Sequence, residues 1–186
     1  LAAQRILNLS ESETLAMTRR CRELTAQGFD VINLSIGEPD FNTPENIKEA
    51  AIKAIHENKT HYPPVPGYLE LRKAICHKLK RDNNLDYTPE RIVVSTGAKH
   101  SIANTIISLV NAGEEVILPA PYWVSYKEMV KLARGVAVFV PTSVETDFKI
   151  TAAQLEAAIT PKTKIILYSS PCNPTGATYG RPMLER

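Results

Sequence analysis

Apolar residues in the first half of the chain recur every three or four positions, the spacing of a helix with one buried face. Met17, Cys21 and Leu24 follow this spacing. Ser10 and Glu13 would form a capping box at the start of this helix, and Gly28 would end it.

The same spacing predicts two further helices, over residues 43–58 and around residues 71–79. Thr43 is the expected N-cap of the first of them, followed by Pro44 at the first helical position.

From residue 91 onward, short β-branched runs replace the helical spacing. These runs cover residues 91–96, 115–120, 136–141 and 163–170, and helical stretches at 102–110, 126–133 and 152–159 lie between them. Runs this continuous leave no polar face, which is typical of a parallel sheet covered on both sides. The sequence therefore predicts an α/β fold: a parallel-type sheet flanked by helices and preceded by an amino-terminal helical segment.

Composition narrows the functional classes. A length of 186 residues suggests one domain or slightly more, and a net charge of +2 without a basic run argues against nucleic acid as a partner. The three cysteines are scattered, so they fit neither a disulfide framework nor a zinc site, and we expect no bound metal. No apolar run reaches the roughly 20 residues that a membrane span needs, and we expect a cytoplasmic protein.

Candidate chemistry lies in three loops that each follow a predicted strand, where α/β sheets bind their ligands. In the first loop, Gly97 leads from a strand directly into a helix, whose exposed N–H groups suit a phosphate. An ordinary strand-to-helix turn is the alternative. The loop is neither a dinucleotide fingerprint nor a Walker A loop, which disfavours a nucleotide-binding domain.

The other two loops hold Trp123 and Asn173. Trp123 is the one tryptophan of the sequence, and it would either stack on a flat cofactor or belong to the core. Asn173 lies between Pro171 and Pro174, which predicts either a rigidly held amide that binds a ligand oxygen or a simple Asx turn.

Five motifs in this order extend the picture. They are GEPDF (37–41), HYPPVPGYLELR (61–72), STGAK (95–99), PAPYWVSY (119–126) and SSPCNPTGA (169–177). Together they resemble the class I aminotransferases, pyridoxal-phosphate enzymes of fold type I, with the greatest likeness to the bacterial aspartate aminotransferase branch. The resemblance covers essentially the whole chain and is more specific for the family than for the amino-acid substrate.

The resemblance implies roles for individual residues. The turn of Gly97, Ala98 and Lys99 would hold the cofactor phosphate through its backbone amides. Trp123 would stack on the pyridine ring. Asn173 would bond the phenolic oxygen of the cofactor, and both side chains would help to orient the substrate.

Two further residues take their roles from the same resemblance. Gly37 would contact the α-carboxylate of the substrate, and Tyr62 would reach the cofactor phosphate of the neighbouring subunit in a homodimer. The implied domains are an amino-terminal arm over residues 1–36, part of the small domain, and an incomplete large cofactor-binding domain over residues 37–186.

Three residues that the family mechanism needs lie downstream of the asparagine loop in the family: a lysine that forms the Schiff base, an aspartate at the pyridine nitrogen and an arginine for the substrate carboxylate. The sequence ends at Arg186, before these positions, and Lys99 matches the phosphate turn instead. We therefore expect the 186 residues alone to lack transaminase activity, whereas the intact parent would transfer an amino group between an aspartate-like amino acid and a 2-oxo acid.

Other readings of the same motifs remain open. Fold type I also includes carbon–sulfur lyases and cyclopropane-carboxylate synthases, and some transcription regulators carry a non-catalytic aminotransferase-like effector-binding domain. No basic helix-turn-helix pattern accompanies the present motifs.

Overall fold

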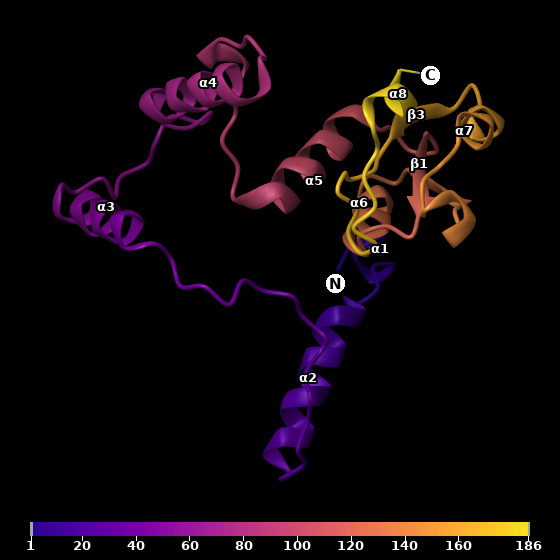
Figure 1. Cartoon of the computed structure of the whole chain (residues 1–186), viewed down its shortest axis with the longest axis horizontal. Helices are drawn as coiled ribbons and strands as arrows, with labels where there is room; N and C mark the ends of the chain where they lie inside the picture. The colour runs from indigo at the N-terminus through magenta and orange to yellow at the C-terminus, as the bar shows by residue number, and fades with distance from the viewer. Residues whose placement is uncertain (1, 186) are drawn as a thin grey trace. The chain divides into compact units, whose positions relative to one another are not determined.

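The computed structural model describes residues 2–185, and contacts within the chain divide them into two compact units. One unit combines the chain up to Ser35 with the chain from Lys99 onward, and the other is Ile36–Ala98 (Figure 1). The first unit contains the sheet.

The sheet consists of three parallel strands in the order β2-β1-β3. Strand β1 (Glu115–Ala120) lies in the middle, between β2 (Val136–Pro141) and β3 (Thr163–Ile166). The first two match the predicted boundaries, and the third begins where predicted but ends four residues earlier. The predicted fold class, a parallel sheet with flanking helices, is confirmed.

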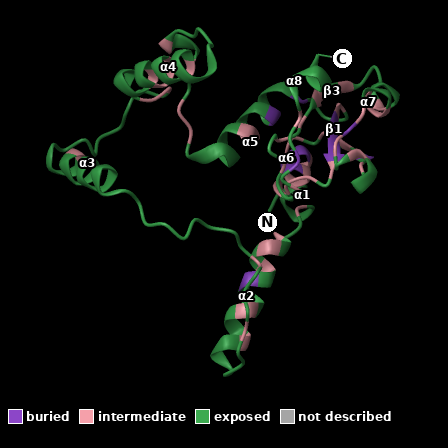
Figure 2. Cartoon of the chain, viewed as in Figure 1, coloured by how far each residue is buried: buried purple, intermediate pink, exposed green. Residues whose placement is uncertain are grey.

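Helices cover both faces of β1, because alternate residues of a strand point to opposite sides. Val116 and Leu118 belong to a buried cluster with Ile106 of helix α5 (Gly97–Leu109) and with residues of α6 (Ser125–Leu132). Ile117 belongs to a second cluster, against which α7 (Ala152–Ala158) packs. Figure 2 shows buried residues on β1 and on the helices around it.

The two outer strands differ from the prediction that every run would be buried on both faces. Ile166 of β3 is 39% exposed and Phe139 of β2 is 45% exposed, whereas Ile117 of β1 is fully buried. The reason is position: within the described residues, β1 has a neighbouring strand on each side, while β2 and β3 each have one.

The predicted strand at 91–96 is wrong. Residues 92–95 form no part of the sheet, and Val93 is 69% exposed. The amide of Val94 donates instead to the carbonyl oxygen of Pro66, at 3.0 Å. A β-branched run becomes a strand only where a second strand meets its backbone, and the described residues supply none here.

The amino-terminal helices are α1 (Gln4–Leu7) and α2 (Glu13–Ala26). The predicted capping box is wrong, because the N-cap is Ser12, which makes no side-chain capping bond, and the amide of Ser10 donates to Glu128. Gly28, with a φ of +89°, ends the helix as predicted.

The second unit contains α3 (Glu45–His56), α4 (Leu69–Asn83) and the 3-10 turn η1 (Pro89–Arg91). Pro44 rather than Thr43 is the N-cap of α3. Arg72 of α4 ties this unit together by donating to the carbonyl oxygens of Gly67 and Pro89, at 3.1 and 2.8 Å.

The remaining short elements are η2 (Val144–Thr146) and α8 (Arg181–Leu184), both in the first unit. Among residues 2–185, no helix combines the length and the hydrophobicity needed to cross a bilayer.

Candidate functional site

The first turn of α5 begins at a residue that must be glycine. Gly97 has a φ of +78°, a region that residues with a Cβ rarely adopt, although no atom lies within 4 Å of where its Cβ would be. Its amide donates to the carbonyl oxygen of Ser95, at 2.9 Å. The amides of Ala98 and Lys99 lie in the first turn of the helix, where backbone N–H groups have no acceptor within the helix and where the helix dipole also favours an anion.

Lys99 links this turn to the loop after β1. Its ammonium group lies 5.0 Å from the centre of the Trp123 ring, in cation–π geometry. The rings of Trp123 and of Tyr126 in α6 are perpendicular, at 90°, with 5.5 Å between their centres. Trp123 is half-buried and packs against the first core cluster. Stacking of its ring on a cofactor stays a prediction.

The asparagine loop after β3 reaches the same tryptophan loop. The thiol of Cys172 lies 3.6 Å from the carbonyl oxygen of Pro121, two residues before Trp123. The side chain of Asn173 is exposed and makes no hydrogen bond with any described residue. An Asx turn needs such a bond, so that alternative is wrong, and the amide of Asn173 is free to bind a ligand.

The structure thus brings together three of the sequence-predicted features within the first unit: Lys99, Trp123 and the Asn173 loop. Gly37 and Tyr62 belong to the second unit, where the ring of Tyr62 is fully exposed and nothing lies within 4 Å of a Cβ built on Gly37. Their roles stay predictions.

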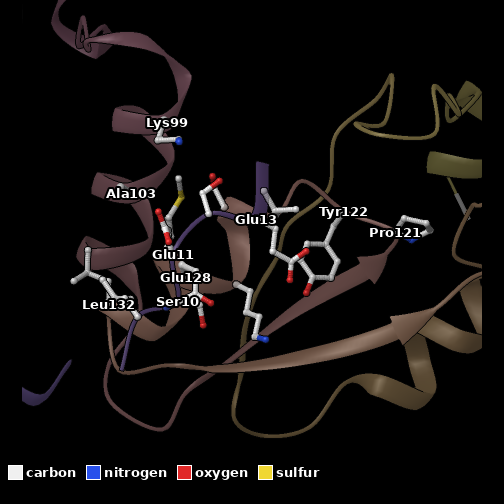
Figure 3. A pocket seen from close by; sticks show the side chains of 15 residues that line it. Ser10, Glu11, Glu13, Lys99, Ala103, Pro121, Tyr122, Glu128 and Leu132 are labelled. Atoms are coloured by element: carbon white, nitrogen blue, oxygen red, sulfur yellow. The ribbon is translucent and has the colours of Figure 1, made fainter. Parts of the chain in front are cut away.

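A cavity of about 590 Å³ is lined by Tyr122 and Val124, the neighbours of Trp123 in the sequence, but not by Trp123 itself. Lys99 and Ala103 of α5 contribute one wall, and Tyr122 contributes another (Figure 3). The amino-terminal residues 9–13 also line it, and the amide of Ser10 donates to the carboxylate of Glu128 at 3.0 Å. Sequence reasoning missed this segment, because nothing local signals a contact between residues 118 positions apart.

The phenol of Tyr122, on the wall of this cavity, keeps its proton at neutral pH and can donate a hydrogen bond. Burial, followed by the negative charges of Glu128 and Glu13, raises the pKa of its phenol above the ordinary value of 10.0. Within the described part of the chain, no three His, Cys, Asp or Glu side chains gather as metal ligands would.

The site therefore offers donors for an anion at the start of α5, an indole face and a free amide. This combination suits a flat ligand that carries a negatively charged group at one end and a hydrogen-bonding oxygen elsewhere.

Known proteins carry the same sequence pattern. The family profile described as aminotransferase class I and II matches residues 29–186. An aspartate/prephenate aminotransferase from Cereibacter sphaeroides is 52% identical over 179 residues, which cover 96% of this chain and 45% of that protein. An aspartate aminotransferase from Bacillus sp. is 51% identical over 185 residues, covering 100% of this chain and 47% of that protein.

Solved structures agree with the sequence relatives. The aspartate aminotransferase from Thermus thermophilus with maleate superposes with a TM-score of 0.96 at 43% identity, covering 100% of this chain and 48% of that one. The chain spans about half the length of the curated relatives it matches. Because the family profile covers more than half of its residues, the chain belongs to the class I and II aminotransferases.

Proposed function

We propose that the turn at residues 97–99, Trp123 and Asn173 belong to the cofactor site of a pyridoxal-phosphate-dependent aminotransferase. The turn would bind the phosphate, the tryptophan would stack on the ring and the asparagine would contribute its amide. The intact enzyme would move an amino group between an amino acid and a 2-oxo acid. The observation that carries the proposal is the meeting of Lys99 with the tryptophan and asparagine loops in the first unit, where Lys99 lies 5.0 Å from the Trp123 ring and Cys172 lies 3.6 Å from Pro121.

The donor set fits pyridoxal phosphate. The amides of Ala98 and Lys99, at the positive end of the helix dipole, would bind the phosphate, and the Lys99 ammonium adds positive charge nearby. Gly97 would contribute the turn geometry, since its own amide is engaged with Ser95. When bound, the cofactor supplies an electron sink for charge that develops on the substrate.

Trp123 and Asn173 would orient the ring. The indole offers a flat apolar surface, and the free amide of Asn173 would donate to the phenolic oxygen, which favours the charged form of that oxygen. Asn173 and Gly37 would also help to hold the α-carboxylate of the substrate.

An aspartate-like amino acid is the substrate class that we propose. Its support is the set of named relatives, which include aspartate aminotransferases and aspartate/prephenate aminotransferases. A homodimer, with Tyr62 reaching the neighbouring phosphate, fits the complete exposure of that ring. The division into a small-domain arm over 1–36 and a large domain over 37–186, and a cytoplasmic location, belong to the same proposal.

The test starts with the coding sequence beyond the codon for Arg186, where a Schiff-base lysine and a late arginine are expected. The protein from the full coding sequence, mixed with pyridoxal phosphate, aspartate and 2-oxoglutarate, should form glutamate and oxaloacetate. Release of a β-substituent without amino transfer would favour a lyase, and cofactor binding without turnover would favour an effector-binding domain.

Trp123→Ala and Trp123→Phe give a matched pair within this test. Stacking of a flat ring on an aromatic side chain contributes about 1–3 kcal/mol, so Trp123→Ala should weaken cofactor binding about 5- to 150-fold. Trp123→Phe keeps a flat ring and should lose much less. Equal cofactor affinity in both variants and the wild type would remove Trp123 from the site.

A further inference from the structure

Among the described residues, one side chain bonds to the backbone of Asn173. The hydroxyl of Ser169 accepts a hydrogen bond from the backbone N–H of Asn173, at 3.2 Å. It is the one hydrogen bond that any atom of Asn173 makes with the described residues. Ser169 itself is half-buried, whereas Asn173 is exposed.

Two backbone bonds close the loop around Asn173, and one of them acts on the same peptide group as the Ser169 bond. The amide of Gly176 donates to the carbonyl of Cys172 at 2.7 Å, and the amide of Cys172 donates to the carbonyl of Ala177 at 2.8 Å. Both bonds shape the loop on either side of Asn173. The Gly176 bond holds the carbonyl end of the peptide group between Cys172 and Asn173, and the Ser169 bond holds its N–H end.

Pro174 limits Asn173 from the other side. A residue before proline is confined to extended backbone conformations, which restricts ψ but leaves the orientation of the preceding peptide group less constrained. The Ser169 bond acts on that preceding peptide group, because the N–H of Asn173 belongs to it. The Ser169 hydroxyl, the Gly176 amide and the proline together therefore define the backbone of Asn173 and leave its side-chain amide free.

We propose that Ser169 is a positioning residue, which holds the Asn173 amide at the place where it meets the bound ligand. The inference rests on the proposed function, since it assigns Ser169 a part in the cofactor site. A misplacement of about 1 Å in a site residue can cost about 100-fold in rate, so a loss between about 10- and 100-fold is expected when the hydroxyl is removed.

Thr and Val are nearly equal in shape and differ in the hydroxyl, so Ser169→Thr and Ser169→Val form a matched pair. Ser169→Ala serves as a second hydroxyl-free variant should the valine variant not fold. Ser170→Ala is a control in the same loop, because the Ser170 hydroxyl accepts the amide of Tyr179, at 3.0 Å, and does not touch Asn173.

The first readout needs no cofactor. Hydrogen exchange of the Asn173 amide, in the protein from the full coding sequence, should be about 2- to 10-fold faster in Ser169→Val than in Ser169→Thr, as expected for the loss of one hydrogen bond. The Cys172 amide, bonded to Ala177, should exchange at the same rate in both variants. Equal exchange of the Asn173 amide in the two variants would overturn the proposal.

The second readout uses the enzyme with pyridoxal phosphate. The pH midpoint of the cofactor absorbance should move in Ser169→Val in the same direction as in Asn173→Ala, but less far, and kcat/KM should fall about 10- to 100-fold. Ser169→Thr and Ser170→Ala should keep the wild-type midpoint. If Asn173→Ala moves the midpoint and Ser169→Val does not, the positioning role is wrong while the proposed function stands. If the wild type binds no pyridoxal phosphate, both fall.

Discussion

The hydroxyl of Tyr179 anchors the end of the asparagine loop to the rest of the sheet unit. It accepts a hydrogen bond from the backbone amide of Ile150, at 3.0 Å, and Ile150 belongs to the second core cluster. The ring of Tyr179 also contacts the ring of Tyr168, with 5.0 Å between the ring centres and 66° between the ring planes. Tyr179→Phe removes the hydroxyl and keeps the ring contact, so it isolates the hydrogen bond.

The expected cost follows from the burial of the amide. Ile150 is 9% exposed, and the structure describes no other acceptor for its N–H. A buried donor left without an acceptor costs about 1–3 kcal/mol, which corresponds to about a 5- to 150-fold faster opening of that amide. The loss should weaken the loop more than the sheet, because the strand bonds of β1 are untouched.

Two measurements check this expectation on the protein from the full coding sequence: the hydrogen exchange rate of the Ile150 amide and the urea concentration at half-unfolding. Tyr168→Phe is the matched control, since among the described residues no hydrogen bond reaches the Tyr168 hydroxyl. It should change stability by less than about 0.5 kcal/mol. If the two variants behave alike, the hydrogen bond contributes nothing and the reasoning fails.

Two further predictions concern other parts of the chain. Gly67→Ala should destabilise the protein by about 2–5 kcal/mol, because Gly67 has a φ of +96° and its new Cβ would lie 2.7 Å from a methyl carbon of Val94. Adding Val94→Gly, which removes both the methyl carbon at 2.7 Å and the Cβ at 2.8 Å, should recover part of this loss in urea unfolding, and strictly additive costs would contradict the clash. The backbone and side-chain amides of Asn111 lower the pKa of Glu114 below 4.5, so this carboxylate stabilises the fold above that pH and loses the effect as the pH falls through its folded pKa. Glu114→Gln should therefore flatten the decline in melting temperature below about pH 4.5, and an unchanged slope would argue against the contribution.

Local patterns were sufficient for much of the fold. The run at 115–120 predicted β1 with its boundaries, and the helical spacing located α6 and α7 to within one residue at each end, whereas α5 begins five residues earlier than predicted. These elements are set by periodicity over short windows, which the sequence displays directly. The position after a strand also singled out Trp123 and Asn173, since the ends of parallel strands meet at one edge of a sheet.

The wrong strand at 91–96 and the wrong capping box at Ser10 share one cause. In both, a backbone amide bonds to a residue that is distant in the sequence. The run at 91–96 has the composition of a strand, but the backbone of Val94 meets Pro66. Serine is a common N-cap residue, but the amide of Ser10 donates a hydrogen bond to the carboxylate of Glu128. Neither partner can be inferred from the residues nearby.

The sequence by itself determined which segments are helical or extended, where glycine is required by the backbone, and which loops carry reactive or ring-bearing side chains. The tertiary structure decided what those side chains touch: Lys99 on the face of Trp123, Cys172 on Pro121, and Ser169 on the peptide of Asn173. The physical reason is range. Backbone preference and periodicity act over a few residues, whereas the partner of a polar group or an aromatic face is chosen by the packing of the whole unit.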